Sequence, residues 1–221
     1  MTVPHLSEST EMYLKVMAEF GEQDVAISRL AERLSVTPVS ASEMVRKLGD
    51  QGLVSHTPYR GVNLTKKGRE AAGDVLRRQR LWELFLYEHL KIEWARVYEF
   101  ACALEHATAP EVTEALAGFL GNPVTCPRGN PIPDERGAFT PLDAIPLSQA
   151  ALGERVTIVA VTATAPDALK HLQEKNLLPG EEVSILEAAP MQGPLMLYVH
   201  GKEVALGLML AEYVLVKPSS S

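Results

Sequence analysis

Apolar residues recur at helical spacing through the first part of the chain. One apolar stripe predicts a helix over residues 8–20, which ends at Gly21. A shorter helix is expected over the segment SRLAERLS, where the hydroxyl of Ser28 would cap the first backbone N–H groups. The stripe of the first helix consists of Tyr13, Val16, Met17 and Phe20.

A third helix and a hairpin follow. Thr37 is the expected N-cap and Pro38 the first helical residue, where the missing N–H of proline has no cost. The β-prone segments 53–55 and 62–64 flank HTPYRG, which predicts a hairpin with a basic, aromatic tip. This order of elements is that of a winged helix-turn-helix, with the third helix as the recognition helix. The expected buried residues of the third helix are Val39, Met44, Val45 and Leu48.

The middle of the chain is helical by the same criterion. A long helix is expected over residues 65–90, and two more over 93–107 and 110–120. The last of these has more apolar residues than one neighbouring helix can cover, so it predicts a homodimer interface. These residues are Val112, Leu116, Phe119 and Leu120.

The apolar period changes after a proline-rich stretch. Six prolines within residues 122–146 indicate a linker. Beyond it, RVTIVAV, EEVSIL, LMLYV, KEVALG and YVLV read as short strands, with one helix over PDALKHLQEK, and this pattern predicts a small SH3-like barrel. The expected fold class is therefore mainly α with a small all-β domain. The predicted parts are a winged helix-turn-helix at 1–73, a helical metal-binding and dimerisation domain at 74–121, a linker at 122–148 and the barrel at 149–217.

Charge is distributed unevenly. The 221 residues carry a net charge of -7, which argues against a protein that coats nucleic acid with its whole surface. Residues 46–78, however, hold eight basic and three acidic side chains, or +5. We interpret this segment as a surface that faces DNA, although a solvated helix face would explain a charge run alone. The expected DNA-binding residues are Ser28, Thr37, Pro38, Ser40, Ser42, Glu43, Arg46, Lys47, Tyr59 and Arg60.

Composition restricts the location of the protein. No apolar run is long enough for a membrane span, and the N-terminus lacks the basic start and apolar core of a signal peptide, so we expect a cytoplasmic protein without a membrane partner. Cys102 and Cys126 are too few for a disulfide scaffold. Each is therefore a buried thiol, a spare thiol or a metal ligand.

One pentad has the pattern of a metal site. Positions i, i+3 and i+4 of a helix share a face, so Cys102, Glu105 and His106 would present a thiolate, a carboxylate and an imidazole together. The spacing alone is weak, because a helical Cys usually belongs to the core and an adjacent Glu-His pair usually lies at the surface.

Several motifs together resemble the diphtheria toxin repressor family, which includes iron-dependent repressors and manganese transport regulators. These are STEMYLKVM, LAERLSVTPVSASEMVRKLGDQGLV, YRGVNLTKKG, CALEH and GNPIP, and the C-terminal part resembles a FeoA-type SH3-like domain. The resemblance covers nearly the whole chain. It implies a dimeric, metal-activated repressor of metal-uptake genes that binds a palindromic operator in double-stranded DNA, and it adds Met12 to Cys102, Glu105 and His106 as a fourth metal ligand.

The resemblance extends poorly to a second metal site. Gln79 and Tyr98 stand where some members carry histidines, and Lys15 stands where two-metal manganese regulators place a carboxylate. Others use a CPHG-like segment, which reads CPRG here and keeps only the thiol. A depleted second site is expected from the remaining candidates, which are Glu83, Cys126 and Asp167.

The identity of the metal stays open at this point. The sulfur ligands favour Fe²⁺, Co²⁺ or Ni²⁺, whereas the resemblance in the wing and the linker favours Mn²⁺, so both Mn²⁺ and Fe²⁺ are kept, with Cd²⁺ and Zn²⁺ as further substitutes. A metalloenzyme is a less suitable interpretation, because no further motif supplies a general base. A metal-independent winged-helix regulator that senses a small organic ligand is the other alternative.

Overall fold

The computed structural model describes residues 6–21, 23–57, 60–138, 142–189 and 193–219. The chain divides into two compact units. The first combines Met1–Gln79, Glu105–Thr113 and Pro133–Phe139, and the second combines Arg80–Leu104, Glu114–Ile132 and Thr140–Ser221. Among the described residues, no helix is both long enough and apolar enough to cross a membrane.

The first unit begins with the helix that the apolar stripe predicts. Helix α1 spans Glu8–Phe20, and the side chain of Ser7 caps it by accepting a hydrogen bond from the N–H of Thr10. It ends at Gly21, whose φ of 62° lies in the left-handed region that favours glycine. Both ends of this helix are therefore determined by local chemistry, and the predicted boundaries are confirmed.

The next two helices confirm one predicted cap and correct another. Helix α2 (Ile27–Arg33) has Ala26 as its N-cap and no side-chain cap, so the expected capping role of Ser28 is wrong. Helix α3 (Pro38–Asp50) begins as predicted, with the hydroxyl of Thr37 accepting from the N–H of Ser40 at 3.1 Å.

The burial expected for α3 needs a correction as well. Val45 and Leu48 are buried, and Met44 is half-buried, but Val39 is 68% exposed. Ala41 fills the core position of the first turn instead. Apolar character alone assigned Val39 to the wrong face of the first turn.

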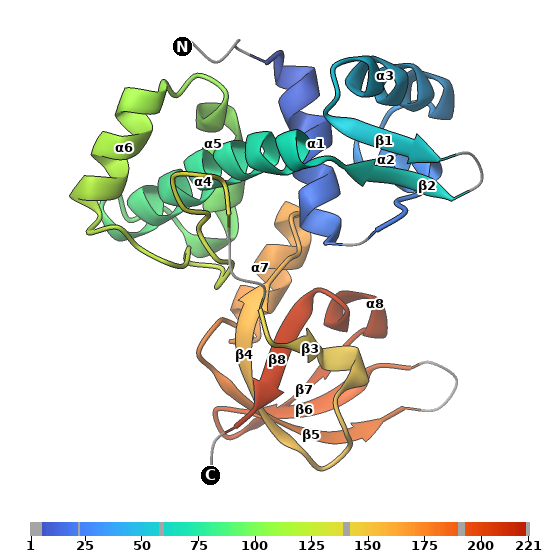
Figure 1. Ribbon diagram of the computed structural model, residues 1–221. Coiled ribbons are helices and arrows are strands. Elements are labelled where there is room, and N and C mark those ends of the chain that lie inside the picture. The colour runs from blue at the N-terminus through green and yellow to red at the C-terminus, as the bar shows by residue number, and fades with distance from the viewer. Residues whose placement is uncertain (1–5, 22, 58–59, 139–141, 190–192, 220–221) are drawn as a thin grey trace. The chain divides into compact units, whose positions relative to one another are not determined.

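A two-stranded wing completes the winged helix-turn-helix of this unit (Figure 1). Strands β1 (Val54–Thr57) and β2 (Gly61–Leu64) pair antiparallel, with Val54 opposite Leu64. The core beneath joins α1, α2, α3 and the wing through residues that include Leu14, Leu30, Val45, Leu48 and Val62.

The predicted helices of the middle region are present with shorter boundaries. The long helix α4 (Lys66–Glu88) spans the division between the two units. The segment expected as one helix over 93–107 is a 3-10 turn, η1 (Trp94–Arg96), followed by α5 (Val97–Glu105), and α6 spans Pro110–Phe119.

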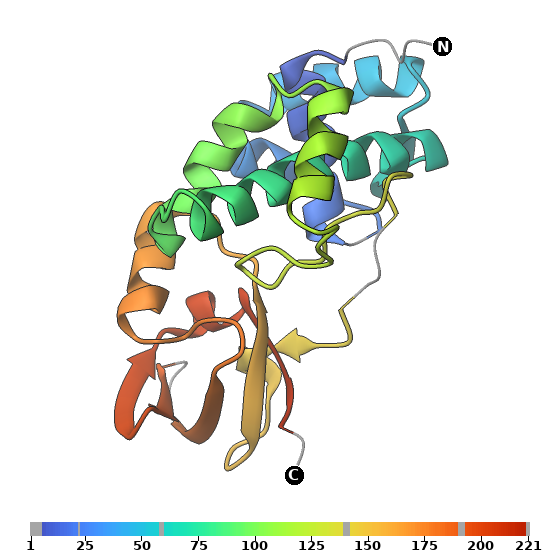
Figure 2. The same ribbon diagram turned by 90° about the vertical axis from the view of Figure 1, so that its left-hand side faces the viewer.

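A six-stranded antiparallel sheet occupies the C-terminal part of the second unit (Figure 2). Its strand order is β3-β8-β4-β5-β6-β7. The five predicted strands are all found, and the short strand β3 was not expected. These elements confirm the predicted fold class. Their bounds are β3 (Ile145–Pro146), η2 (Leu147–Gln149), β4 (Arg155–Val161), α7 (Pro166–Glu174), β5 (Glu182–Ala188), β6 (Leu195–Val199), β7 (Lys202–Leu206), α8 (Leu208–Ala211) and β8 (Val214–Pro218).

Gly73 of α4 allows a close backbone approach inside the first unit. A Cβ atom at this position would stand 2.1 Å from the carbonyl oxygen of Gly137. We expect Gly73→Ala to lower the free energy of unfolding by about 1 to 3 kcal/mol, because a backbone atom must move to make room. Gly49→Ala in α3 is the control, since nothing lies within 4 Å of its Cβ position. It should stabilise the helix by about 0.5 to 1 kcal/mol. Urea unfolding measures both, and equal stability of the two variants would contradict the close approach.

Candidate metal centre and nucleic-acid interface

A buried ion pair connects α1 to the end of α5. The Nζ of Lys15 lies 2.5 Å from Oε1 of Glu105, and the two side chains are 1% and 0% exposed. A carboxylate without solvent contact is costly unless positive charge compensates it. The position of Glu105 is therefore electrostatically coupled to α1.

A second charged network holds His106, and it consists of Glu11 from α1 and Arg78 from α4. The Nδ1 of His106 lies 2.6 Å from Oε2 of Glu11, and Oε1 of Glu11 accepts a hydrogen bond from Arg78 at 2.6 Å. Glu105 and then Glu11 raise the pKa of His106 against the opposing effect of burial. In the neutral ring, Nδ1 carries the proton that Glu11 accepts, so Nε2 presents a lone pair.

Three buried atoms of this cluster lack hydrogen-bond partners among the described residues. One is a donor, Nε of Arg78, and the other two can accept, namely Oε2 of Glu105 and Nε2 of His106. His106 Nε2 does lie 3.2 Å from Oε1 of Glu105, so the two attract when the ring is protonated, but the alignment is not that of a hydrogen bond. Buried acceptors without partners are rare, and a bound cation would satisfy both. The carboxylate oxygen and the imidazole nitrogen are therefore suitable ligands for a divalent metal.

The other two predicted ligands are on the same two helices. Met12 is half-buried and follows Glu11 in α1. Cys102 is a half-buried free thiol one turn before Glu105 in α5, which is the spacing that the pentad predicted. No group of three or more His, Cys, Asp and Glu side chains that could hold a metal ion is found in the described part of the chain.

Sequence reasoning missed two members of this cluster. Glu11 was assigned no role, and Lys15 was considered only as the replacement of a carboxylate of two-metal regulators. Arg78 was counted in the basic segment 46–78 expected to face DNA, but its side chain is 14% exposed and pairs with Glu11. A signal existed in part, because Glu11 and Lys15 stand at i and i+4 on the apolar side of α1. Their partners are 67 to 95 residues away in sequence and could not be identified from local spacing.

Of the three candidates for a second metal site, Glu83 and Cys126 share one buried environment, and Asp167 does not. Glu83 is fully buried and accepts two hydrogen bonds from Arg128, at 2.9 and 3.2 Å. Cys126 is buried nearby, and burial followed by the charge of Glu83 raises the pKa of its thiol to about 12. Asp167 is exposed in the first turn of α7.

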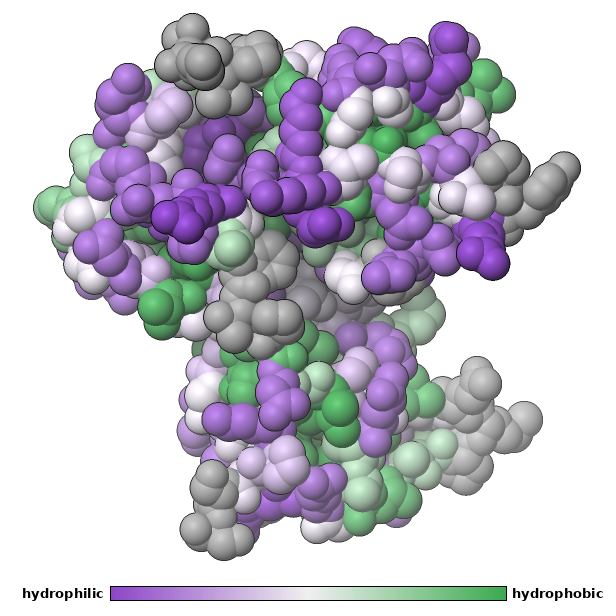
Figure 3. All heavy atoms as spheres, viewed as in Figure 1, coloured by the Kyte–Doolittle hydropathy of each residue, from purple (hydrophilic) through white to green (hydrophobic). Residues whose placement is uncertain are grey.

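The face of α3 expected to contact DNA is exposed and polar (Figure 3). Three of its hydroxyls are already hydrogen-bonded within the helix: Thr37 and Ser40 pair at 3.0 Å, and Ser42 donates to the carbonyl of Pro38 at 2.9 Å. They shape the start of the helix. The remaining expected DNA-binding residues are exposed where they are described, namely Ser28, Glu43, Arg46, Lys47 and Arg60, whereas Tyr59 lies outside the described residues.

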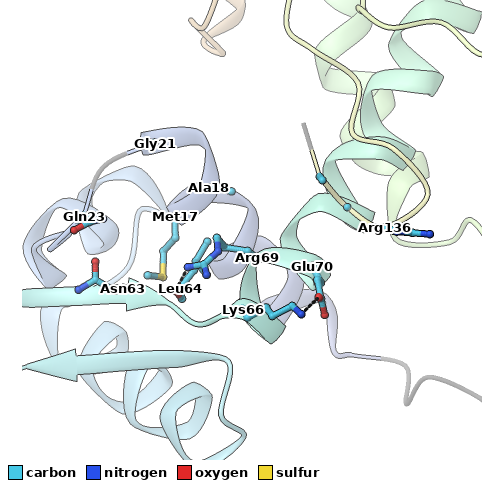
Figure 4. Close-up of a pocket in the computed structure, with 12 residues that line it drawn as sticks. Met17, Ala18, Gly21, Gln23, Asn63, Leu64, Lys66, Arg69, Glu70 and Arg136 are labelled. Atoms are coloured by element: carbon cyan, nitrogen blue, oxygen red, sulfur yellow. Dashed lines mark hydrogen bonds and ion pairs between the residues drawn. The ribbon is translucent and has the colours of Figure 1, made fainter. Parts of the chain in front are cut away.

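A cavity of about 860 Å³ lies in the first unit, away from this face (Figure 4). Its lining joins Met17 of α1 to Leu64 of the wing and Arg69 of α4. Arg69 donates to the carbonyl of Leu64, and Lys66 pairs with Glu70, so these two of the cations in the close-up have local partners. None of the predicted metal ligands lines this cavity.

The expected dimer surface carries exposed apolar residues. Val112 and Phe119 of α6 are 47% and 65% exposed, and Leu90 after α4 is 55% exposed. Leu116 is buried instead, because it packs in the cluster around Leu81. The apolar exposure of α6 is typical of a surface that a second subunit covers.

Three family models match successive parts of the chain. They describe the N-terminal DNA-binding domain of an iron-dependent repressor at residues 5–62, the metal-binding and dimerisation domain of an iron-dependent repressor at 65–134, and a FeoA domain at 145–218. The matched domains imply that the chain binds a DNA operator as a dimer and contains a domain for a divalent metal.

Similar proteins agree over the whole length. The iron-dependent repressor IdeR of Mycobacterium bovis is 30% identical over 96% of this chain and 98% of its own. The diphtheria toxin repressor of Corynebacterium diphtheriae is 30% identical over 91% and 93%.

Solved structures extend this agreement to three dimensions. A manganese-dependent transcriptional repressor in complex with manganese is 30% identical, with a TM-score of 0.88 over 95% of this chain and 100% of that one. ScaR with bound Cd²⁺ is 27% identical, with a TM-score of 0.85 over 95% and 99%. The chain therefore belongs to the iron-dependent repressor family of IdeR and the diphtheria toxin repressor, and it is a metal-dependent transcriptional repressor, not an enzyme.

Proposed function

We propose that Mn²⁺ or Fe²⁺ activates this repressor, with Met12, Cys102, Glu105 and His106 as the ligands. The observation that supports this set is the pair of buried atoms without hydrogen-bond partners, Oε2 of Glu105 and Nε2 of His106. The thioether and thiol suit Fe²⁺, and Co²⁺, Ni²⁺, Cd²⁺ and Zn²⁺ would be substitutes in vitro. The similar structure solved with manganese supports Mn²⁺ as the other candidate.

The metal, when bound, supplies positive charge and a link between ligands on two helices. The residues of the chain prepare that link. Glu11 orients the ring of His106 through Nδ1, so that Nε2 is available, and Arg78 holds Glu11. Lys15 compensates the charge of Glu105 from the same helix. The arrangement thereby joins α1, which packs in the core of the winged helix, to the end of α5.

The link matters because a dimer must present two recognition helices at the spacing of an operator with two half-sites. We propose that holding α1 to α5 favours this arrangement, and that the protein thereby represses metal-uptake genes in the cytoplasm. A 100-fold rise in operator affinity requires that the DNA-competent arrangement is favoured by about 2.7 kcal/mol. A few ligand bonds can supply that difference.

Loss of the carboxylate should remove the metal response. We expect Glu105→Gln to abolish the Mn²⁺- or Fe²⁺-stimulated binding of operator DNA while the dimer persists, because the amide is a weaker ligand without charge. Glu99→Gln, an exposed change on the same helix, is the control. Fluorescence anisotropy with DNA from metal-transporter promoters, titrated with each metal and then chelated, measures the effect. If Glu105→Gln does not fold, Cys102→Ala tests the same ligand set. Stimulation that survives both changes would reject the proposed ligands.

The residue that holds His106 should tune metal affinity. We expect Glu11→Gln to weaken metal binding by about 10- to 100-fold, because the imidazole loses the carboxylate that orients it. Glu8→Gln changes an exposed side chain one turn earlier on α1 and should leave the affinity unchanged. Isothermal titration with Mn²⁺ compares the two variants, and equal affinities would count against the role of Glu11.

The exposed cations of α3 should carry part of the DNA contact. We expect Arg46→Ala to weaken binding to every DNA sequence to a similar degree and to reduce the slope of log affinity against log salt by about one, as the loss of one phosphate contact would. Arg155→Ala, at an exposed position of β4, is the control. Anisotropy at several salt concentrations gives the slope, and an unchanged slope would place Arg46 outside the interface.

A further inference from the structure

A tight loop of the proline-rich segment, residues 126–130, packs against β4 within the second unit. The N–H of Cys126 donates to the carbonyl of Asn130 at 3.0 Å, which closes the loop. Its outer side pairs with the strand, since the N–H of Val161 donates to the carbonyl of Arg128 at 2.8 Å. The Asn130 side chain adds a bond to the carbonyl of Val161 at 2.9 Å. The loop therefore presents Arg128 in one orientation.

Gly129 makes this approach possible. Its φ of 78° is in the left-handed region, and a Cβ atom there would lie 1.9 Å from the carbonyl oxygen of Val159. Only a residue without a side chain permits both the turn and the contact. The position of Arg128 thus follows from the backbone as well as from its own contacts.

The guanidinium of Arg128 lies inside a shell of partners that reaches all three of its nitrogens. Its Nε and Nη2 contact the two oxygens of Glu83 at 3.2 and 2.9 Å. Its Nη1 donates to the carbonyls of Val161 and Ala163 at 3.3 and 2.9 Å. The ring of Tyr98 lies 4.6 Å from the guanidinium carbon, and the Arg128 side chain is 3% exposed. This is a bidentate pair, with Nη1 directed at two carbonyl groups.

The same shell has the chemistry of a cation site. A carboxylate, backbone carbonyls and the nearby thiol of Cys126 are groups that would otherwise hold a divalent metal. The third candidate for such a site, Asp167, is exposed on α7. We propose that the guanidinium of Arg128 occupies the position of a second metal ion, so that each subunit binds one regulatory metal and this second position never responds to metal.

The contacts of Arg128 also join the six-stranded sheet with its helices, called the β-domain below, to α4 and α5. Glu83 belongs to α4 and Tyr98 to α5, whereas Val161 ends β4. The indole of Trp94 donates to the carbonyl of Pro127 at 2.9 Å, and Trp94 packs in the core of the β-domain. A metal-independent cation at this junction keeps the β-domain attached when metal is scarce.

Protection of Cys126 from alkylation tests the proposal. Cys102→Ser is introduced first, so that Cys126 is the only thiol, and all metal is removed with a chelator. The chain with Arg128 should keep Cys126 unreactive, and Arg128→Ala should accelerate its labelling by roughly a hundredfold, because a buried carboxylate then lacks its partner. Arg155→Ala is the exposed matched control and should leave the rate unchanged. Circular dichroism verifies the fold, and Arg128→Lys, which keeps the charge without the bidentate geometry, should give an intermediate rate.

If the chelator alone accelerates the alkylation of Cys126 in the protein that keeps Arg128, the proposal is overturned, because a metal would then hold the junction. Equilibrium dialysis of the chain with both cysteines supplies the second measurement. No more than one Cd²⁺ per subunit is expected, and two would also overturn the proposal. A failure of the proposed primary ligands would instead appear as metal stimulation that survives Glu105→Gln and Cys102→Ala with Cys126 still protected, so the two proposals fail separately.

Discussion

A carboxylate that is removed from water must be matched by positive charge, and this constraint organises both units of the protein. Glu105 and Glu83 have no exposed surface, and each meets a cation from a distant part of the chain. Lys15 reaches Glu105 across 90 residues of sequence, and Arg128 reaches Glu83 across 45. Removal of either cation would strand a buried charge, which typically costs about 3 to 5 kcal/mol.

The two pairs differ in how completely the carboxylate is satisfied. Both oxygens of Glu83 are hydrogen-bonded to the planar guanidinium. The ammonium of Lys15 contacts one oxygen of Glu105, and the other lacks a hydrogen-bond partner among the described residues. An ammonium acts as a point charge, so it leaves coordination capacity that a guanidinium would use up. The incomplete pair is where the proposed regulatory ion binds, and the complete pair is structural.

Much of the fold could be predicted from the sequence, because its determinants are local. The boundaries of α1 follow from the apolar stripe and from Gly21, and α3 begins where Thr37 and Pro38 indicate. The predicted strands follow from alternation and turn residues. The errors are local as well: Ser28 has the composition of a cap, but α2 begins before it, and Val39 is apolar but faces outward.

The candidate site was only partly predictable. The CALEH spacing located Cys102 and Glu105 on α5 and His106 directly after its end, since helical periodicity determines which residues share a face. The partners that give these side chains their chemistry, Glu11 and Lys15, come from another helix, and no local pattern encodes such a pairing. The comparison of CPRG with a CPHG-like segment showed that Arg128 replaces a histidine. The ion pair of Arg128 with Glu83 could not be predicted, because the two residues are distant in the sequence.

The Glu83–Arg128 pair also determines how sharply the repressor can respond. A side-chain cation has no free concentration, so its occupancy does not vary with the metal supply of the cell. Each subunit then binds metal at a single site, and the occupancy of that site depends hyperbolically on the concentration of free metal. Any steeper, sigmoidal response at a promoter must arise from the coupling of two subunits on one operator.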